Sequence, residues 1–401
     1  MTIEIPRRVR ELVAPQFDII NSRAAAWRER GADVVNLGQA VPGFPPPAAA
    51  LAAAVNALAD GNTHVYSADA GLPELRETLC RRLASQLQVR VEPEREMIIT
   101  AGANQALLLA LLTLLEPGDE VVLPSPYFMN HEMAVRAVGA VPVEAPLAED
   151  TGFALHLADL EPFLSSHTRA VVVVSPNNPT GAVYSPAELE KVGRAMLARG
   201  IYVLADETYM HFVYETARHY SLASLPEWRA GVLVCGSFSK SFAMTGWRAG
   251  YLIAPAEVIT EALKIQDAMV ICAPVITQKA VLAAATTEWN YSQQFLPELN
   301  ARRRYVRDRL KEIPSLAWHP TEGGFFAFVR VAGCDDAERL AMDVLDREHV
   351  VTIPGNFFGR SGQGFLRLSY GAVDIPALRE AFDRLQRCFG QRGMLLTNSP
   401  G

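Results

Sequence analysis

The chain has 401 residues, half of them hydrophobic and a fifth charged, which predicts a globular protein of about two or three domains. The 44 acidic residues outnumber the 37 basic ones, the formal net charge is −7, and no run of Lys and Arg forms a basic stripe, so we expect no nucleic-acid partner. No helix-like apolar stretch approaches the ~20 residues that a membrane-spanning helix needs, and we expect no membrane partner.

The first two-thirds of the chain has the pattern of an α/β fold. A predicted helix at residues 17–30 and a proline-rich linker at 42–47 come first. Between residues 47 and 283, helical periodicity then alternates with short β-branched runs, as in βαβ units around a mostly parallel sheet. The predicted helices are residues 72–87, 103–115, 186–199 and 256–270. The predicted strands are residues 97–100, 120–123, 170–175, 201–206, 232–237 and 250–254.

The remaining third of the chain has a different pattern of predicted helices and strands. A charged helical stretch at residues 288–313 comes first, and short strands at 325–330 and 365–369 follow it. Helices at residues 335–348 and 375–389 flank these strands, and the residues from Gly390 onward are expected to form a loose tail. This arrangement predicts a smaller α+β domain.

The segment at residues 236–250, Gly-Ser-Phe-Ser-Lys-Ser-Phe-Ala-Met-Thr-Gly-Trp-Arg-Ala-Gly, is the most informative one. It contains Lys240, one of only five lysines, among small hydroxyl residues. A solvated surface loop is the common alternative, but the segment follows a predicted strand, and active sites of open α/β sheets lie at strand carboxyl ends. A nucleotide-binding P-loop is excluded because Ser239 stands where that motif requires glycine, and the chain has no G-x-G-x-x-G motif.

Three other segments follow predicted strands. Ser-Pro-Asn-Asn-Pro-Thr-Gly at residues 175–181 is typical of a turn. Asp206, in Asp-Glu-Thr-Tyr at 206–209, fits a helix cap as well as it fits a functional acid. Thr-Ala-Gly-Ala-Asn-Gln-Ala at residues 100–106 leads through small residues into a predicted helix, whose N-terminus would favour an anion, although most such turns bind nothing.

Taken in order, these segments resemble the class I/II aminotransferases, the fold-type-I family that depends on pyridoxal 5′-phosphate (PLP). Further resemblances are Asn-Leu-Gly-Gln-Ala-Val-Pro-Gly-Phe-Pro-Pro-Pro at 36–47, the Y-x-x-x-x-G-x-x-x-L-R pattern at 66–76 and Phe-Leu-Arg-Leu-Ser-Tyr at 365–370. The resemblance implies a three-layer αβα large domain at residues 47–283 and a small domain built from residues 1–46 and 284–401. It also implies transfer of an amino group from an amino acid to a 2-oxo acid.

The resemblance assigns roles around the cofactor ring. Lys240 would form the Schiff base with PLP and then move a proton at the substrate α-carbon. Asp206 would keep the pyridine nitrogen protonated. Tyr209 and Asn178 would donate hydrogen bonds to the phenolate oxygen of the ring. Phe128 stands where many relatives carry a tryptophan stacked on the pyridine.

The family pattern also assigns residues to the phosphate and the substrate. The phosphate would be held by Arg248, Ser237, Ser239 and the helix start at Gly102, Ala103 and Asn104. Tyr66 matches a tyrosine that reaches the phosphate from the neighbouring subunit, which implies a homodimer. Arg367 would bind the substrate α-carboxylate together with Asn178, and Gly38 would close over it.

Departures from the family pattern concern the substrate. Asn104 stands where aspartate-using members often carry lysine, and this puts a dicarboxylate preference in doubt. Three alternatives stay open: a β-eliminating C–S lyase, an oxidative deaminase or decarboxylase, and a regulator that senses PLP or an amine. The regulator is disfavoured because no DNA-binding pattern precedes the large domain. The five cysteines are scattered without C-x-x-C pairs, so we expect no metal site and a cytoplasmic location.

Overall fold

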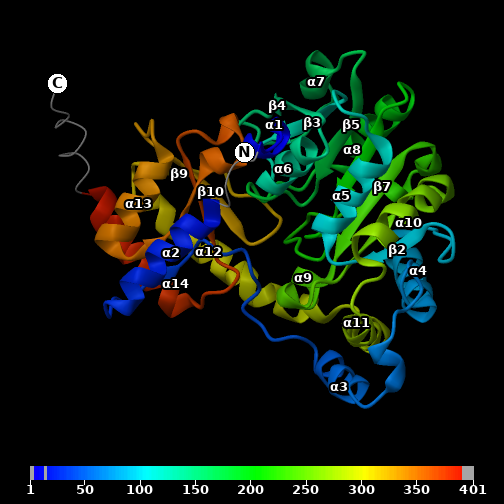
Figure 1. Ribbon diagram of the computed structural model, residues 1–401. Coiled ribbons are helices and arrows are strands. Elements are labelled where there is room, and N and C mark those ends of the chain that lie inside the picture. The colour runs from blue at the N-terminus through cyan, green and yellow to red at the C-terminus, as the bar shows by residue number, and fades with distance from the viewer. Residues whose placement is uncertain (1–3, 13–15, 391–401) are drawn as a thin grey trace.

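The computed structural model describes residues 4–12 and 16–390, and a seven-stranded sheet forms its centre (Figure 1). The strand order is β2-β8-β7-β6-β5-β3-β4, in which β8 runs antiparallel to both neighbours and the other pairs are parallel. The strands are β2 (Met97–Thr100), β3 (Glu120–Ser125), β4 (Val141–Pro146), β5 (Thr168–Val174), β6 (Tyr202–Asp206), β7 (Val232–Ser237) and β8 (Gly250–Ile253).

Helices cover both faces of this sheet. Val171 and Val173 of β5 belong to the hydrophobic cluster under α4, α8 and α11, whereas Val172 and Val174 belong to the cluster under α5, α6 and α10. Successive strand residues point to opposite faces, so a strand buried on both faces is apolar throughout. The helices are α3 (Ala48–Ala57), α4 (Pro73–Leu87), α5 (Ala103–Leu114), α6 (Met129–Ala137), α7 (Leu157–Leu160), α8 (Pro186–Leu197), α10 (Ala256–Val270) and α11 (Val275–Thr287). The predicted three-layer α/β class is confirmed.

A separate four-stranded antiparallel sheet, in the order β12-β13-β10-β9, lies among the C-terminal helices. Its strands are β9 (Leu316–Trp318), β10 (Phe326–Val331), β12 (Ile353–Pro354) and β13 (Phe365–Ser369). The accompanying helices are α12 (Leu296–Lys311), α13 (Ala337–Glu348) and α14 (Ile375–Gly390). The predicted single helix at residues 288–313 is wrong at its start: a 3₁₀ turn at Tyr291–Phe295 precedes α12, which begins with Pro297 in its first turn.

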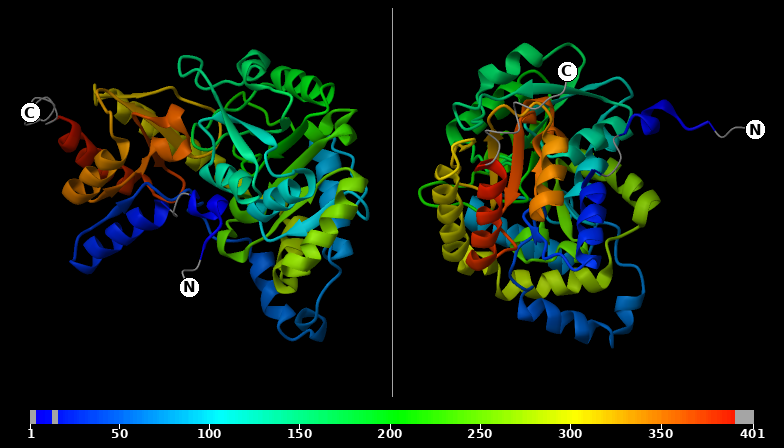
Figure 2. Two further views of the ribbon diagram at one scale, coloured as in Figure 1. Left: turned by 45° about the horizontal axis from the view of Figure 1, so that its top comes forward. Right: turned by 90° about the vertical axis from the view of Figure 1, so that its left-hand side faces the viewer.

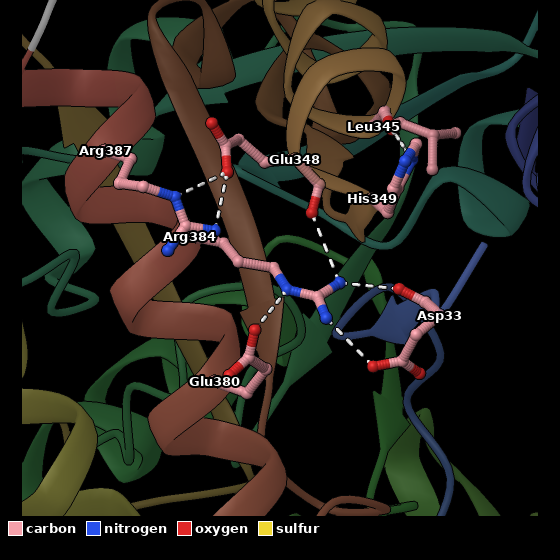
Figure 3. A network of polar contacts seen from close by, with 7 residues as sticks. All are labelled: Asp33, Leu345, Glu348, His349, Glu380, Arg384 and Arg387. Carbon is pink, nitrogen blue, oxygen red and sulfur yellow. Dashed lines mark hydrogen bonds and ion pairs between the residues drawn. The ribbon is translucent and has the colours of Figure 1, made fainter.

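The two ends of the chain meet beside this smaller sheet, where they form a further two-stranded sheet. Helices α1 (Arg7–Arg10) and α2 (Gln16–Glu29) come first, and Figure 2 shows α2 beside α13. Strand β1 (Val35–Asn36) pairs in parallel with β11 (Val350–Val351). On α14, Arg384 donates to the backbone and side chain of Asp33, to Glu380 and to the carbonyl of Glu348 (Figure 3). Of the predicted tail, only Gly390 lies within the described residues, where it ends α14.

No helix in the described ranges combines the length and apolar character needed to cross a bilayer.

Candidate active site

The carboxyl ends of three parallel strands lie at one edge of the central sheet. Val174 of β5 pairs with Asp206 of β6, and Asp206 pairs with Cys235 of β7. The loops that follow these strands therefore meet, as the position of active sites in open α/β sheets requires. They border a cavity of about 470 Å³ lined by Phe17, Asn21, Gly38, Gln39, Ala40, Val41, Ala103, Asn104, Phe128, Val174, Asn178, Asp206, Thr208, Tyr209, Ser237, Ser239, Lys240, Thr245, Arg248 and Arg367.

Lys240 projects from α9 (Phe238–Ser241), the short helix that directly follows β7. Ser237, the last residue of β7, caps this helix by accepting a hydrogen bond from the Ser239 backbone N–H at 3.1 Å. The Lys240 Nζ donates to the carbonyl oxygen of Ala40 at 2.6 Å. Burial and, to a smaller extent, repulsion from Arg367 and Arg248 together lower the pKa of Lys240 to about 8. About a tenth of the amine is therefore uncharged at pH 7, far more than for an exposed lysine.

Asp206 lies buried at the end of β6, with both carboxylate oxygens occupied. His131 Nε2 lies 3.0 Å from Oδ2, and the backbone N–H of Thr208 donates to Oδ1 at 2.9 Å. Burial opposes ionisation of the carboxyl group, but the hydrogen bonds from His131 and Thr208 outweigh it and keep the pKa of Asp206 below its ordinary value. The floor of the cavity thus carries a negative charge.

Arg367 enters the cavity from β13 of the smaller sheet, whereas Lys240 enters it from α9 beside the central sheet. Its side chain is fully buried and donates to Asn178 Oδ1 at 2.9 Å and to the Gly38 carbonyl at 2.6 Å. Its Nε is buried without a hydrogen-bond partner. Burial lowers the pKa of Arg367 to about 10, so the guanidinium is still charged at neutral pH and has N–H donors to spare for an anion.

Gly38 is required at its position because there is no room for a side chain. A Cβ there would lie 2.8 Å from Cγ1 of Val351 and 3.0 Å from Cδ1 of Ile353. Asn36 Oδ1 accepts hydrogen bonds from the backbone N–H groups of Gly38 and Gln39. This turn places the carbonyl oxygens of Gly38 and Ala40 against Arg367 and Lys240 respectively.

The opposite end of the cavity is suited to an anionic group. Helix α5 begins there after Gly102, and the N–H groups of its first turn have no acceptor within the helix. Arg248 packs against Gly102, where an added Cβ would lie 2.6 Å from the Arg248 Nη2. The Arg248 guanidinium donates to the carbonyls of Thr245 at 2.9 Å and Ala101 at 3.1 Å. With Ser237 and Ser239, these groups form a cradle of donors.

Besides Phe17, two aromatic residues line the cavity, Phe128 and Tyr209. Phe128 precedes α6, and its ring meets that of His131 edge to face at 5.5 Å. Tyr209 is buried, and burial raises the pKa of its phenol, which is therefore a neutral hydrogen-bond donor.

The structure places all the sequence-predicted site residues except two along the cavity itself. Gly102 is the first exception: it does not line the cavity but packs against Arg248, which does. Tyr66 is the second: it is 74% exposed and lies on the surface beside residues 272–276, away from the cavity of its own chain.

Sequence analysis missed His131, which touches Asp206, and Phe17, whose ring lies 5.4 Å from the Arg367 guanidinium carbon. His131 stands three residues after Phe128, so their side chains are neighbours on one helical turn, and this spacing is the signal that was available. Phe17 had no local signal because its partner is at the other end of the chain.

The comparisons with known proteins agree with this geometry. The family model described as aminotransferase class I and II matches residues 32–385. An aspartate aminotransferase of Pyrococcus abyssi is 35% identical over 90% of this chain and 92% of its own length. An aromatic-amino-acid aminotransferase 2 of Thermococcus litoralis is 34% identical over 90% and 93%. The solved structure of a Thermus thermophilus aspartate aminotransferase with maleate matches 96% of this chain and 100% of that one, with 33% identity and a TM-score of 0.90.

Proposed function

The chain belongs to the class I and II aminotransferase family, and we propose that it carries out the family reaction in the cavity beside Lys240. It is a PLP-dependent aminotransferase, which moves an amino group from an amino acid to a 2-oxo acid. When bound, PLP supplies an aldehyde for amine capture and a ring that withdraws electrons from the substrate α-carbon. The observation that carries the assignment is that Lys240, Asp206 and Arg367 line one cavity.

The residues present fit PLP at both ends of the cavity. Gly102 leaves the space into which Arg248 packs, and this arginine, Ser237, Ser239 and the N–H groups of Ala103 and Asn104 would hold the phosphate. The ionised carboxylate of Asp206 would hold a proton on the pyridine nitrogen, and His131 and Thr208 fix its orientation. Phe128 would cover one face of the ring, and Tyr209 with Asn178 would donate to its phenolate oxygen.

The remaining polar groups would position the substrate and move its proton. Arg367 would pair with the α-carboxylate through N–H groups that Asn178 and the Gly38 carbonyl leave available. The Lys240 amine is uncharged in part because its pKa is lowered to about 8. Its Nζ would accept the proton from the substrate α-carbon and then pass it to the cofactor. Closing the segment that carries Gly38 over the substrate would exclude water from this step.

The organisation of the protein is part of the proposal. We propose a large domain at residues 47–283 and a small domain from residues 1–46 and 284–401, supported by the separation of the seven-stranded sheet from the two smaller sheets and by the Arg384 to Asp33 contact. We propose a homodimer in which Tyr66 of each subunit reaches the phosphate in the other, supported by its exposure. The absence of C-x-x-C pairs supports a cytoplasmic location.

The test is to incubate the purified protein with PLP, reduce it with borohydride and map the modified lysine by mass spectrometry. We expect the adduct on Lys240, and we expect Lys240→Ala to slow amino transfer by about a hundred- to ten-thousandfold. Lys264→Ala is the matched control because Lys264 is exposed and paired only with Glu261. Native turnover by Lys240→Ala, or pyruvate and ammonia released without a 2-oxo acid acceptor, would contradict the proposal.

A further inference from the structure

The charges in the cavity are unevenly distributed. Among residues 4–12 and 16–390, the basic side chains on its lining are Lys240, Arg248 and Arg367. Arg248 is bound to the carbonyls beside α5, at the end that would hold the phosphate, and Lys240 is required for the chemistry. Arg367 therefore is the one described cation left for the substrate, and a substrate α-carboxylate already uses it.

The wall around Arg367 is uncharged. The Phe17 ring lies 5.4 Å from the guanidinium carbon, and Asn21 lies one turn further along α2 on the same cavity. Gln39, Ala40 and Val41 form the adjoining edge, next to the Gly38 carbonyl that accepts from Arg367. This surface offers an aromatic face, short apolar side chains and neutral amides to whatever projects from the substrate α-carbon.

We propose that the amino acid and 2-oxo acid substrates of this enzyme carry uncharged, largely apolar side chains. This inference rests on the proposed function of the same cavity. A second carboxylate beside Phe17 and Val41 would lose hydration without gaining a cation, and a buried charge left without a partner is strongly unfavourable. An apolar side chain loses no such interaction and buries surface against Phe17.

The surface around Tyr66 brings no strong cation either. It is lined by Leu58, Thr63, His64, Val65, Cys272, Ala273, Pro274, Val275 and Ile276, none of which is Lys or Arg. The nearby Lys279 is held by Asp60 at 2.5 Å and by Thr63 at 2.7 Å. In the proposed homodimer this surface would approach the other subunit's cavity, and it would leave a second substrate carboxylate without a pairing residue.

The experiment combines a half-reaction panel with a binding measurement. The PLP-loaded enzyme is mixed with phenylalanine, leucine, methionine, aspartate or glutamate without an acceptor, and conversion of the cofactor is followed by absorbance. We expect conversion with at least one neutral donor to be about tenfold or more faster, as rate constant over half-saturating concentration, than with aspartate or glutamate. Separately, 3-phenylpropanoate should bind about tenfold or more tightly than maleate in calorimetric titrations.

Asn21→Arg tests whether the missing cation causes the substrate preference, because it adds a cation to the same wall. Asn21→Gln is the matched neutral variant. We expect Asn21→Arg to strengthen maleate binding and narrow the gap between the donor classes, while Asn21→Gln, which adds no charge, keeps 3-phenylpropanoate the tighter ligand and a neutral donor the faster one. Faster conversion with aspartate or glutamate, or maleate bound at least as tightly as 3-phenylpropanoate, would overturn the side-chain inference alone. If no donor converts and borohydride leaves Lys240 unmodified, the proposed function itself fails.

Discussion

At the residue scale, Lys240 shows how the cavity changes a side chain that is common on protein surfaces. Arg367 and Arg248 both repel its positive charge, and burial removes the water that would otherwise stabilise the ammonium. Burial is the larger of these causes, and only Asp206 acts in the opposite direction. The result is an amine that is a nucleophile and a base at a pH where an exposed lysine is almost fully protonated.

This environment predicts the pH dependence of cofactor attachment. Only the uncharged amine reacts with an aldehyde, and because the pKa of Lys240 is lowered to about 8, the uncharged fraction rises with pH and levels off above that value. We expect the rate constant for PLP attachment to the cofactor-free protein to increase from pH 6 and reach a plateau above about pH 8. Stopped-flow absorbance at constant ionic strength measures it.

Arg367→Gln is the informative variant because it removes one charge that repels the Lys240 ammonium. The pKa of Lys240 should rise, and the inflection in the plot of attachment rate against pH should move to higher pH. Arg330→Gln serves as the control because Arg330 is a half-exposed arginine that is paired with Glu149 and does not line the cavity. An inflection near the ordinary lysine pKa of about 10.4 in the wild type would contradict the account.

The residue assignments that sequence reasoning reached share one property. Lys240, Asp206 and Asn178 lie at or shortly after the carboxyl ends of strands, so a local pattern and the chain order were sufficient to bring them together. His131 and Phe17 act through contacts between segments far apart in the chain, the first with Asp206 and the second with Arg367. No spacing in the sequence predicts the contact of Phe17 with Arg367, because it depends on how the two ends of the chain pack, whereas His131 could have been noticed only through its spacing from Phe128.

At the element scale, the start of α5 depends on Gly102. Its φ is +88°, in the left-handed region, and a Cβ would lie 2.6 Å from Nη2 of Arg248. A side chain here therefore strains the backbone and also displaces the guanidinium that would hold the phosphate. These two effects can be separated, since Gly118 has a φ of +94° and open space around its Cβ position.

We predict that Gly102→Ala weakens PLP binding by about ten- to hundredfold, the loss of one charge-assisted hydrogen bond worth about 1.5–3 kcal/mol. Gly118→Ala should bind PLP as the wild type does. Both variants should lose similar stability, about 1–2 kcal/mol, from backbone strain. Fluorescence titration with PLP and urea unfolding measure the two quantities, and equal PLP affinities for the two variants would show that Gly102 acts through the backbone alone.

The helices and strands were predictable where the pattern of apolar residues in the sequence matches the burial in the structure. The buried strand β5 was recognised from its apolar run, because helices cover both faces of the sheet there. Strand β4 went unrecognised since it is an edge strand that contains Pro142 and Pro146, and proline is tolerated only at edges. The helical periodicity runs through residue 297 and therefore does not reveal where α12 begins. Pro297, in the first turn of α12, explains why the helix begins there.

At the scale of the whole molecule, α3 presents an apolar stripe that is left exposed by the described residues of the single chain. Leu51, Val55 and Leu58 are all exposed and follow the spacing of one helical face. Val65 and Tyr66, exposed by 61% and 74%, continue this surface toward the loop at residues 272–276. A contiguous exposed apolar surface of this kind marks an interface, and a two-fold axis would bring each Tyr66 toward the other subunit.

This geometry predicts that two inactive variants restore one another. Lys240→Ala and Tyr66→Asp should each be nearly inactive, the first because it lacks the amine and the second because it places a carboxylate beside the phosphate. If Tyr66 acts across the interface, a mixed dimer has one site with both defects and one with neither. Unfolding and refolding the two together in equal amounts should therefore recover about a quarter of the wild-type sites. Measuring amino transfer before and after mixing, with sedimentation to establish the dimer, tests this directly: a monomer, or a mixture no more active than its components, would show that Tyr66 does not act across an interface.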